Sequence, residues 1–443
     1  MATKYGLFAA LVTGWAVLSG SANAATQAQG LSHQTVISQS DAYRASRQGQ
    51  YFIVELLTPH QVISTSSYNG GQSENIRYLV NHQSMEAKGD NQRFMAQISQ
   101  SRESYHTTIA KRLAINPNEM ALMGTAANMQ QMASVSNSFK DLTVTVFATA
   151  GVKNNALRAG DNTRWYQQID GQKVSNKKVQ PTPRVPKKNK AVPQQTQPKT
   201  DHQGTINIMV LVNKAVSHGA QQKIAMLATE AKSAALSELS IGSGQSSHLA
   251  TGTGTDQLII ASPISLDSPA LPSASGHLKL GELVGKTVKK AVLDALLWQN
   301  KMDAVQHHNV LHALARFGLS KNRLLEHLQT HLPSSEYDLA EQNINALIND
   351  ARLSASAYAY ASVLDKWQYQ ALPVAIQAEV FRDQAAQIAV ALSAKPQHWP
   401  TFWQQLELPP AALKQQATQH EQQQAFIELF THALALGWQY KWR

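Results

Sequence analysis

The chain has 443 residues, of which 43% are hydrophobic and 15% charged, a balance typical of a globular protein with room for two or three domains. It contains no cysteine, which excludes disulfides, thiolate nucleophiles and cysteine metal sites within it. The formal net charge of +10 raises the question of a nucleic-acid or membrane partner, so the position of the excess charge matters more than its size.

Residues 1–24 have the features of a secretory signal. The cation Lys4 precedes the apolar stretch LFAALVTGWAVL, and small residues stand at Ala22 and Ala24. We therefore expect cleavage at about Ala24 and a periplasmic or secreted mature protein, with an uncleaved N-terminal anchor as the alternative. No later segment reaches the length of about 18 apolar residues expected of a membrane-spanning helix.

From about residue 50, short β-rich runs alternate with helical periodicity. Three runs predict strands, at 51–57, 61–65 and 142–151, and 120–127 is a short buried run that ends in small residues. Residues 92–113 predict a polar-faced helix. The Asn-Gly-Gly sequence at 69–71 is a strong turn signal.

The excess positive charge is concentrated in residues 172–203. This stretch holds eight Lys or Arg residues against the single acid Asp201, and it is rich in Pro, Gln and Lys. With few large apolar residues it cannot bury enough surface to offset its ordering entropy, which predicts a disordered basic insert. It lacks the interleaved aromatic residues that stack on bases, so we expect a solvated loop and no nucleic-acid partner.

Strand and helix patterns resume after the insert. Residues 204–213 predict the clearest strand of the chain, and residues 220–239 place small apolar residues at helical spacing, which permits close packing of a helix on a sheet. The sequence ATGTGTD, at 250–256, precedes an apolar run, and another helix is expected from about residue 277. This alternation predicts an α/β fold, a layered sheet-and-helix core domain over residues 35–300.

Residues 301–443 contain helical segments and no strand candidates. Six of the eight tryptophans lie at or beyond this junction. We therefore predict a separate, all-helical C-terminal domain with aromatic packing, for which the sequence offers no chemical motif.

Three short patterns resemble known sites but fail on spacing or context. ATGTGTD lacks the third glycine of a dinucleotide loop and precedes a strand instead of following one. GELVGKT, at 281–287, is one residue short of a phosphate-binding loop. His308 and His312 have the spacing of two metal ligands on a helix, but no glutamate or third ligand accompanies them, so we expect a packed or solvated pair and no metal site.

Small polar turns stand at the ends of the predicted strands, where α/β sheets usually place ligands. With their order and spacing, these turns and the segments around them make the chain resemble the adenosylcobinamide amidohydrolase family over roughly residues 50–297. The resemblance rests on STSSYNGG, TAGVKNNALRAG, GTINIMVLVN, ATEAKSAALSEL, ATGTGTD and KLGELVGKTVKKAV.

The resemblance implies hydrolysis of the amide that links the aminopropanol arm of adenosylcobinamide to the corrin ring. The products are adenosylcobyric acid and aminopropanol, as in corrinoid salvage. No cofactor is then required, because the cobalt belongs to the corrinoid substrate. The family offers no settled catalytic assignment, so residue roles come from side-chain chemistry.

Amide hydrolysis needs a base, donors for an oxyanion and an acid for the leaving amine. We expect Asp256 to act as general base or to orient water, with Glu230 and Lys232 as a polar pair that positions it or protonates the amine. The backbone amides of residues 252–255 are candidates for an oxyanion nest. Turn capping by Asp256 and a helix-edge charge at Glu230 are the alternatives. The expected substrate-binding residues are Asn69, Gly70, Gly71, Thr149, Gly151, Asn155, Thr205, Asn207, Thr229, Thr251, Gly252, Thr253, Gly254 and Thr255.

Other readings of the sequence stay open. Cleavage before Thr205 would create an N-terminal threonine able to act as nucleophile and base. A periplasmic corrinoid-binding protein without catalysis, whose helical domain docks onto a membrane transporter or stores ligand, is the main functional alternative. Hydrolysis of another amide, such as a peptide or a cell-wall fragment, is a more distant one.

Overall fold

The computed structural model describes residues 34–84, 98, 101–153, 155–163, 165–167, 173–175, 204–265, 268–303, 309–408 and 417–442. The predicted signal at 1–24 lies outside these residues, and so does most of the predicted insert at 172–203. The described part of that insert, strand β12 (Lys173–Ser175), pairs antiparallel with β11 (Trp165–Gln167). The start of the insert is therefore paired, where the sequence predicted disorder.

The first sheet has five strands in the order β1-β2-β3-β6-β7. All neighbours are antiparallel except β6 and β7, which are parallel. Helix α3 (Arg102–Arg112) covers its outer face and begins at Ser101, whose side chain accepts a hydrogen bond from the backbone of Ser104. The strands are β1 (Thr35–Gln39), β2 (Tyr43–Gln48), β3 (Tyr51–Leu56), β6 (Tyr78–Gln83) and β7 (Met120–Thr125).

The second sheet has six strands in the order β5-β4-β15-β13-β9-β8. Its central pair, β13 and β15, is parallel, as expected for strands joined by the crossover helix α4 (His218–Glu238). The other pairs are antiparallel. The strands are β4 (His60–Ser64), β5 (Gly71–Ser73), β8 (Ala133–Phe139), β9 (Leu142–Ala150), β13 (Ile206–Val212) and β15 (Gln257–Pro263).

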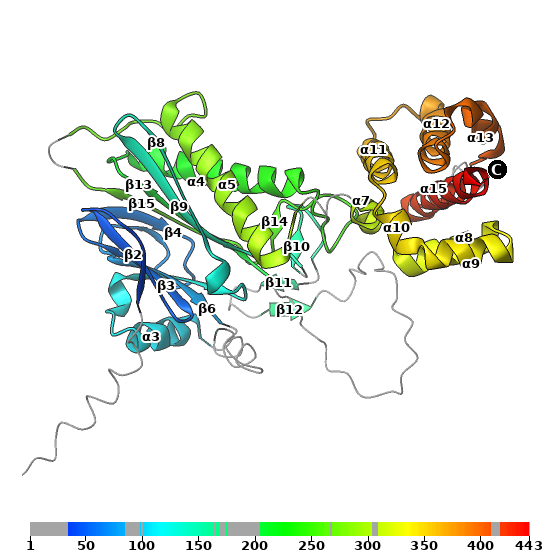
Figure 1. Cartoon of the computed structure of the whole chain (residues 1–443). Coiled ribbons are helices and arrows are strands. Elements are labelled where there is room, and N and C mark those ends of the chain that lie inside the picture. The colour runs from blue at the N-terminus through cyan, green and yellow to red at the C-terminus, as the bar shows by residue number, and fades with distance from the viewer. Residues whose placement is uncertain are drawn as a thin grey trace, which may run out of the picture.

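The two sheets and their helices form four layers, with α3 on one outer side and α4 and α5 (Lys279–Asn300) on the other (Figure 1). Strand β13 shows how the layers are made. Ile208 and Val210 belong to the core beneath the helices, whereas Met209 and Leu211 belong to the core between the sheets. A strand covered on both faces is apolar throughout, which is why this run was the clearest strand signal in the sequence. The predicted layered α/β fold is confirmed.

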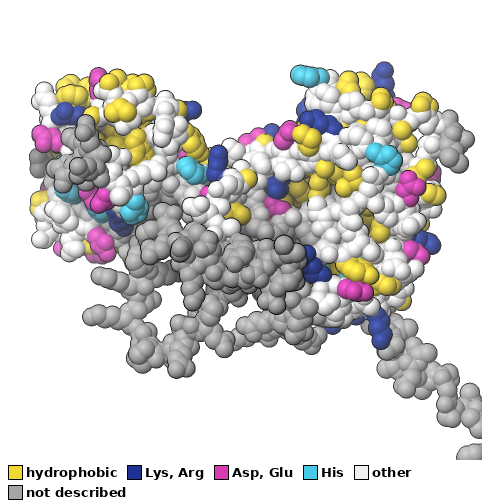
Figure 2. All heavy atoms as spheres, turned by 180° about the vertical axis from the view of Figure 1, so that it is seen from behind, with side chains coloured by type: hydrophobic (Ala, Val, Ile, Leu, Met, Phe, Trp, Pro, Cys, Tyr) yellow, Lys and Arg dark blue, Asp and Glu magenta, His cyan; other side chains and the backbone are white. Residues whose placement is uncertain are grey.

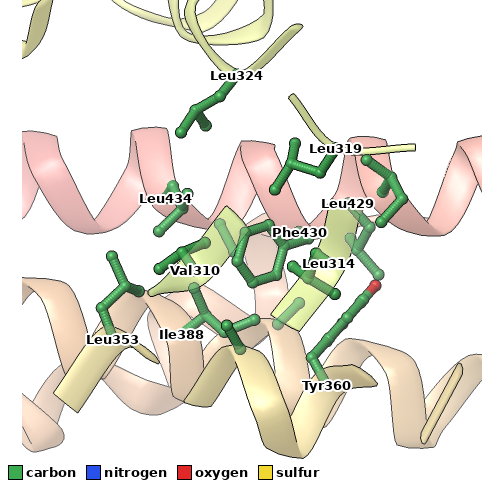
Figure 3. Packing of buried hydrophobic residues seen from close by; sticks show 14 of the residues in the cluster. Val310, Leu314, Leu319, Leu324, Leu353, Tyr360, Ile388, Leu429, Phe430 and Leu434 are labelled. Carbon is green, nitrogen blue, oxygen red and sulfur yellow. The ribbon is translucent and has the colours of Figure 1, made fainter. Parts of the chain in front are cut away.

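Beyond residue 303 the described residues contain helices and no strand, which confirms the helical C-terminal prediction. Their side chains converge on one core, in which Tyr360 is fully buried and donates its hydroxyl to the carbonyl of Phe426 (Figure 3). The longer helices are α8 (Lys321–His331), α9 (Ser334–Gln342), α11 (Ala351–Gln368), α12 (Val374–Ser393) and α15 (Gln419–Lys441). The shorter helix α7 (Val310–Leu314) precedes them, and α10 (Ile344–Ile348) and α13 (Trp399–Gln405) lie between them in the chain. In the described parts of the chain, no helix is both long and apolar enough to cross a membrane.

The helical region contacts the α/β region through the segment 239–248. Arg316 makes a bidentate ion pair with Asp365 at 2.5 and 2.6 Å and also donates to the carbonyl of Ser247. Gln368 donates to the hydroxyl of the same serine. Seen from behind, the two lobes meet at a narrower middle part, and basic and acidic side chains are interspersed over the described residues of this face (Figure 2).

We expect the change Arg316→Ala to destabilise the helical region by about 3–5 kcal/mol. Only 7% of the Arg316 side chain and 17% of the Asp365 side chain are exposed, so the variant leaves a largely buried carboxylate without its partner. The measurement is urea denaturation followed by tryptophan fluorescence. The double variant Arg316→Met/Asp365→Leu, which removes both charges, should recover much of the loss, and a double variant no more stable than the single one would contradict the argument.

His82 lies fully buried between the first sheet and α3, where its Nδ1 is 2.7 Å from the hydroxyl of Tyr105. Burial, aided by the charge of Arg112, lowers the pKa of His82 from 6.5 to about 3. The unfolded chain therefore binds a proton that the folded chain excludes. The resulting stabilisation is fully present above about pH 6.5 and is lost as pH falls toward 3, at about 1.4 kcal/mol per pH unit. Denaturant titrations between pH 4.5 and 7.5 should show a shallower loss for His82→Gln than for the wild type, and equal slopes would contradict the assignment.

Candidate functional site

Strand ends from distant parts of the sequence meet at one edge of the second sheet. Asn207, near the start of β13, pairs with Gln257 at the start of β15 and with Thr149 near the end of β9. Ser64, at the end of β4, pairs with Ile259. The polar corners at 69–71, 149–155, 204–207 and 250–256 therefore lie along the same edge. The first sheet joins them through Gly124, whose amide donates to the side chain of Gln257 at 2.9 Å.

The carboxylate of Asp256 accepts hydrogen bonds from four donors. Lys232 Nζ lies 2.6 Å from Oδ2, which also accepts from the amide of Thr253 at 3.0 Å. The amide of Ile206, at 3.0 Å, and the hydroxyl of Thr253, at 2.5 Å, donate to Oδ1. The side chains of Asp256 and Lys232 are 16% and 12% exposed, so this is a partly desolvated ion pair.

Four donors occupy the roughly four acceptor positions of a carboxylate, which leaves none of them to take a proton from water. The arrangement therefore favours a positioning role for Asp256 over the predicted general base. Through these hydrogen bonds the carboxylate connects the loop before β15 to the start of β13, at Ile206, and to α4, at Lys232. Gly252 is required beside it, because a Cβ at that position would lie 2.4 Å from Asp256 Oδ2 and 2.7 Å from Lys232 Nζ.

Glu230 and Thr229 are exposed on α4, and the described contacts bring neither to Asp256. Glu230 stands two positions before Lys232, and helical residues at that spacing point in different directions. Thr229 bonds its hydroxyl back to the carbonyl of Ala225. The predicted polar pair of Glu230 with Lys232 is thus not formed, and the helix-edge alternative for Glu230 fits its position.

The predicted oxyanion nest at 252–255 is not supported by the hydrogen bonds of that turn. The amide of Thr253 is bound to Asp256, that of Gly254 to the carbonyl of Asn155, and that of Thr255 to the hydroxyl of Thr253. All three of these donors are therefore already engaged within the protein. Strand β14 (Gly252–Thr253) pairs with β10 (Ala156–Leu157), and the hydroxyl of Thr251 accepts from the amide of Ala159, which holds the 250–256 and 149–160 corners together.

A second polar cluster lies on the face of β13 that is turned toward the first sheet. Asn207 is fully buried and donates through Nδ2 to Asn81 Oδ1 at 2.9 Å and to the carbonyl of Gly124 at 3.0 Å. Asn81 in turn donates to the hydroxyl of Thr149 at 2.9 Å. Asn207 Oδ1 is buried without a hydrogen-bond partner among the described residues. Sequence reasoning missed Asn81, which is the first of three consecutive polar residues that follow Tyr-Leu-Val in the strand YLVNHQ.

A third group surrounds the peptide bond between Gly204 and Thr205. The hydroxyl of buried Thr205 lies 2.7 Å from the carbonyl oxygen of Thr255 and 2.6 Å from its hydroxyl. Asn155 Nδ2 donates to the carbonyl of Gly204 at 2.8 Å and to the hydroxyl of Thr255 at 3.1 Å. Gly151 donates its amide to the carbonyl of Thr205 at 3.0 Å. These four residues and Gly204 form a compact polar corner beside Asn207.

The remaining predicted residues shape turns. Asn69 has a φ of 54° and donates its side-chain amide to the carbonyl of Pro117 at 2.8 Å, so the amide is engaged within the protein. A Cβ on Gly70 would lie 2.2 Å from the carbonyl oxygen of Ser66. Gly71 has a φ of 92°, which glycine adopts without steric cost.

The histidine pair predicted to be structural is only half described. His312 lies 3.1 Å from the carbonyl oxygen of Leu239 through its Nε2, and His308 lies outside the described residues. Within the described ranges, no three His, Cys, Asp or Glu side chains are placed to hold a metal ion together.

Comparison with known proteins adds two likenesses. Residues 33–304 match the family model described as adenosylcobinamide amidohydrolase. The uncharacterized protein MJ1613 of Methanocaldococcus jannaschii is 31% identical to this chain over 203 residues, which cover 45% of this chain and 71% of the relative. The family match spans all three polar clusters and ends before the helical region.

Proposed function

Because this chain belongs to the adenosylcobinamide amidohydrolase family, we propose that it hydrolyses the aminopropanol amide of adenosylcobinamide to adenosylcobyric acid and aminopropanol. The observation that carries this proposal beyond the family's name is the buried Asn207 Oδ1, which has no hydrogen-bond partner among the described residues and lies at the edge where the polar corners meet. A buried acceptor without a hydrogen bond costs about 1–3 kcal/mol of free energy, so binding of a ligand that donates to this oxygen is favoured.

An amide substrate supplies that donor. Both hydrogens of the Asn207 amide group are already committed to Asn81 and Gly124, which fixes the orientation of its carbonyl oxygen. Asn207 is 0% exposed, so this edge must open before the N–H of the scissile amide, or an NH₂ group of a corrin side arm, can donate to Oδ1. Asn155 and the hydroxyls of Thr205 and Thr255 offer further polar groups on the same side of β13.

The test is to incubate the purified mature protein with adenosylcobinamide and to follow aminopropanol and adenosylcobyric acid by mass spectrometry. Stoichiometric release of both products is expected. Binding without release would select a corrinoid-binding protein, and neither binding nor release would leave another amide as the substrate.

A corrinoid-binding protein without catalysis is the second candidate. It is favoured by the saturated carboxylate of Asp256, since the described residues near the amide cluster then include no carboxylate with an open acceptor position. Under this proposal the same amide groups would hold the side arms of the corrin and no bond would be cut.

We further propose export, from residues 1–24, and a reaction that needs no cofactor because the cobalt belongs to the substrate. A membrane transporter as a partner of the helical region is a separate proposal from the sequence. The family match ends at residue 304, so it says nothing about that region.

A further inference from the structure

We propose that the chain cleaves its own Gly204–Thr205 bond and that the freed Thr205 is the nucleophile of amide hydrolysis. The self-cleavage is argued from the geometry around this bond. The role of Thr205 as nucleophile rests on the proposed function, because it assigns a catalytic residue to the hydrolysis of the adenosylcobinamide amide.

Among the described residues, no basic group lies beside the hydroxyl of Thr205. Its hydroxyl bonds only to the backbone and hydroxyl oxygens of Thr255 among the described residues, and neither is basic at neutral pH. A threonine hydroxyl is a weak nucleophile unless an adjacent base activates it. An α-amino group on Thr205 itself, with an ordinary pKa of about 7.7–8.0, would be such a base, and breaking the bond to Gly204 creates it.

The carbonyl that must be attacked is already polarised. Asn155 Nδ2 donates to the carbonyl oxygen of Gly204 at 2.8 Å, where negative charge would develop in a tetrahedral intermediate. Asn155 is held in turn by Thr255, which also contacts the Thr205 hydroxyl. Thr255 therefore links the donor Asn155 to the nucleophile Thr205, and Asn155 in turn contacts the scissile bond.

The backbone at Gly204 is one that only glycine accommodates. Its φ is 123°, and a Cβ there would lie 2.4 Å from the carbonyl oxygen of Gly151. Thr205 itself is 4% exposed, whereas Gly254 and Thr255 on the rim are exposed. Separation of the two chain ends after cleavage would open Thr205 toward that rim.

The self-cleavage balances with water as the only co-reactant. A water molecule takes the proton of Thr205 Oγ1 as Oγ1 bonds to the carbonyl carbon of Gly204, and a proton returns from water to the departing nitrogen of Thr205 as the carbon–nitrogen bond breaks. Water then hydrolyses the ester, which leaves a carboxylate on Gly204 and restores the hydroxyl.

The same groups then act on the substrate amide. The α-amino group takes the proton of Oγ1 as Oγ1 attacks the substrate carbonyl. Asn155 Nδ2, released from Gly204, can donate to the new oxyanion, and the leaving amine departs with the proton. Water hydrolyses the ester formed with Thr205, releasing the acid and restoring the nucleophile.

The experiment is intact-mass analysis and N-terminal sequencing of the purified full chain, with the aminopropanol assay on the same sample. We expect two associated polypeptides, the second beginning at Thr205. Thr205→Ser should cut at the same bond, Thr205→Ala should give no cut there and no turnover, and Asn155→Ala should slow the cut by roughly 100- to 1000-fold. A cooperative thermal melt of Thr205→Ala establishes that this uncut variant folds.

The two proposals can fail separately. One uncut chain that releases aminopropanol overturns the self-cleavage and leaves the proposed function standing. A chain cut before Thr205 that releases none supports the self-cleavage and overturns the proposed reaction. A Thr205→Ala chain that is still cut before residue 205, or that still turns over, overturns the role of the Thr205 hydroxyl.

Discussion

Replacing Asp256 with alanine is expected to lower the stability of the α/β region by about 3–5 kcal/mol and to abolish turnover. The change leaves the ammonium of Lys232 desolvated without its partner, which is the costly way to break a buried ion pair. It also orphans the amides of Ile206 and Thr253. Because the amide of Ile206 adjoins Thr205, the loss should loosen the corner at the start of β13. Urea denaturation and the aminopropanol assay measure the two effects.

The variant Asp256→Asn separates positioning from proton transfer. If Asp256 positions the corner, Asp256→Asn should lose part of the stability and of kcat together, and Lys232→Met should show the same paired loss. A general base would behave differently. In that case Asp256→Asn would keep nearly full stability and lose kcat almost completely, and the acidic limb of the pH–rate profile would vanish.

Replacing Asn207 with alanine should reduce kcat/KM for adenosylcobinamide by about 10- to 100-fold. The lost carbonyl oxygen is the buried acceptor that the site leaves open, and a hydrogen bond of this kind is worth about 1–3 kcal/mol when its absence leaves a buried partner unpaired. Steady-state kinetics measure the change, and urea denaturation records the accompanying loss of the bonds to Asn81 and Gly124.

Asn81→Ala is the matched control for this prediction. It removes a hydrogen-bond partner of Asn207 and the bond to Thr149, yet it leaves the Asn207 carbonyl in place. Its stability should fall about as far as that of Asn207→Ala, while its kcat/KM falls less. Equal kinetic losses in both variants would show that Asn207 only supports the fold.

Several features of the site could be predicted from the sequence because they depend on local chemistry. The Asn-Gly-Gly turn after β4 follows from residues that tolerate a positive φ, and the turn before β15 needs Gly252 because Asp256 and Lys232 approach it closely. Lys232 was predicted to lie near Asp256, as one of a polar pair with Glu230. It lies in a helix between two parallel strands, and a crossover helix of that kind returns to the sheet edge from which the next strand starts.

Other features could not be predicted, because they depend on which way a side chain points. Glu230 and Lys232 stand two residues apart, and only the docking of α4 on the sheet decides that the lysine faces Asp256. The same holds for the turn at 252–255, whose amides bind within the turn and to the carbonyl of Asn155. A turn sequence specifies that donors are available but not which acceptors are near.

The sequence by itself determined the α/β core, the helical C-terminal region and the family, because these depend on hydrophobic periodicity and on motifs in a fixed order. Only the tertiary structure decided that Asn207 faces the first sheet while its neighbour Ile206 faces the helices, and that Asn81 and Asn155 complete the polar clusters. The physical reason is that a strand alternates its side chains between two faces, and long-range pairing alone determines what each face meets.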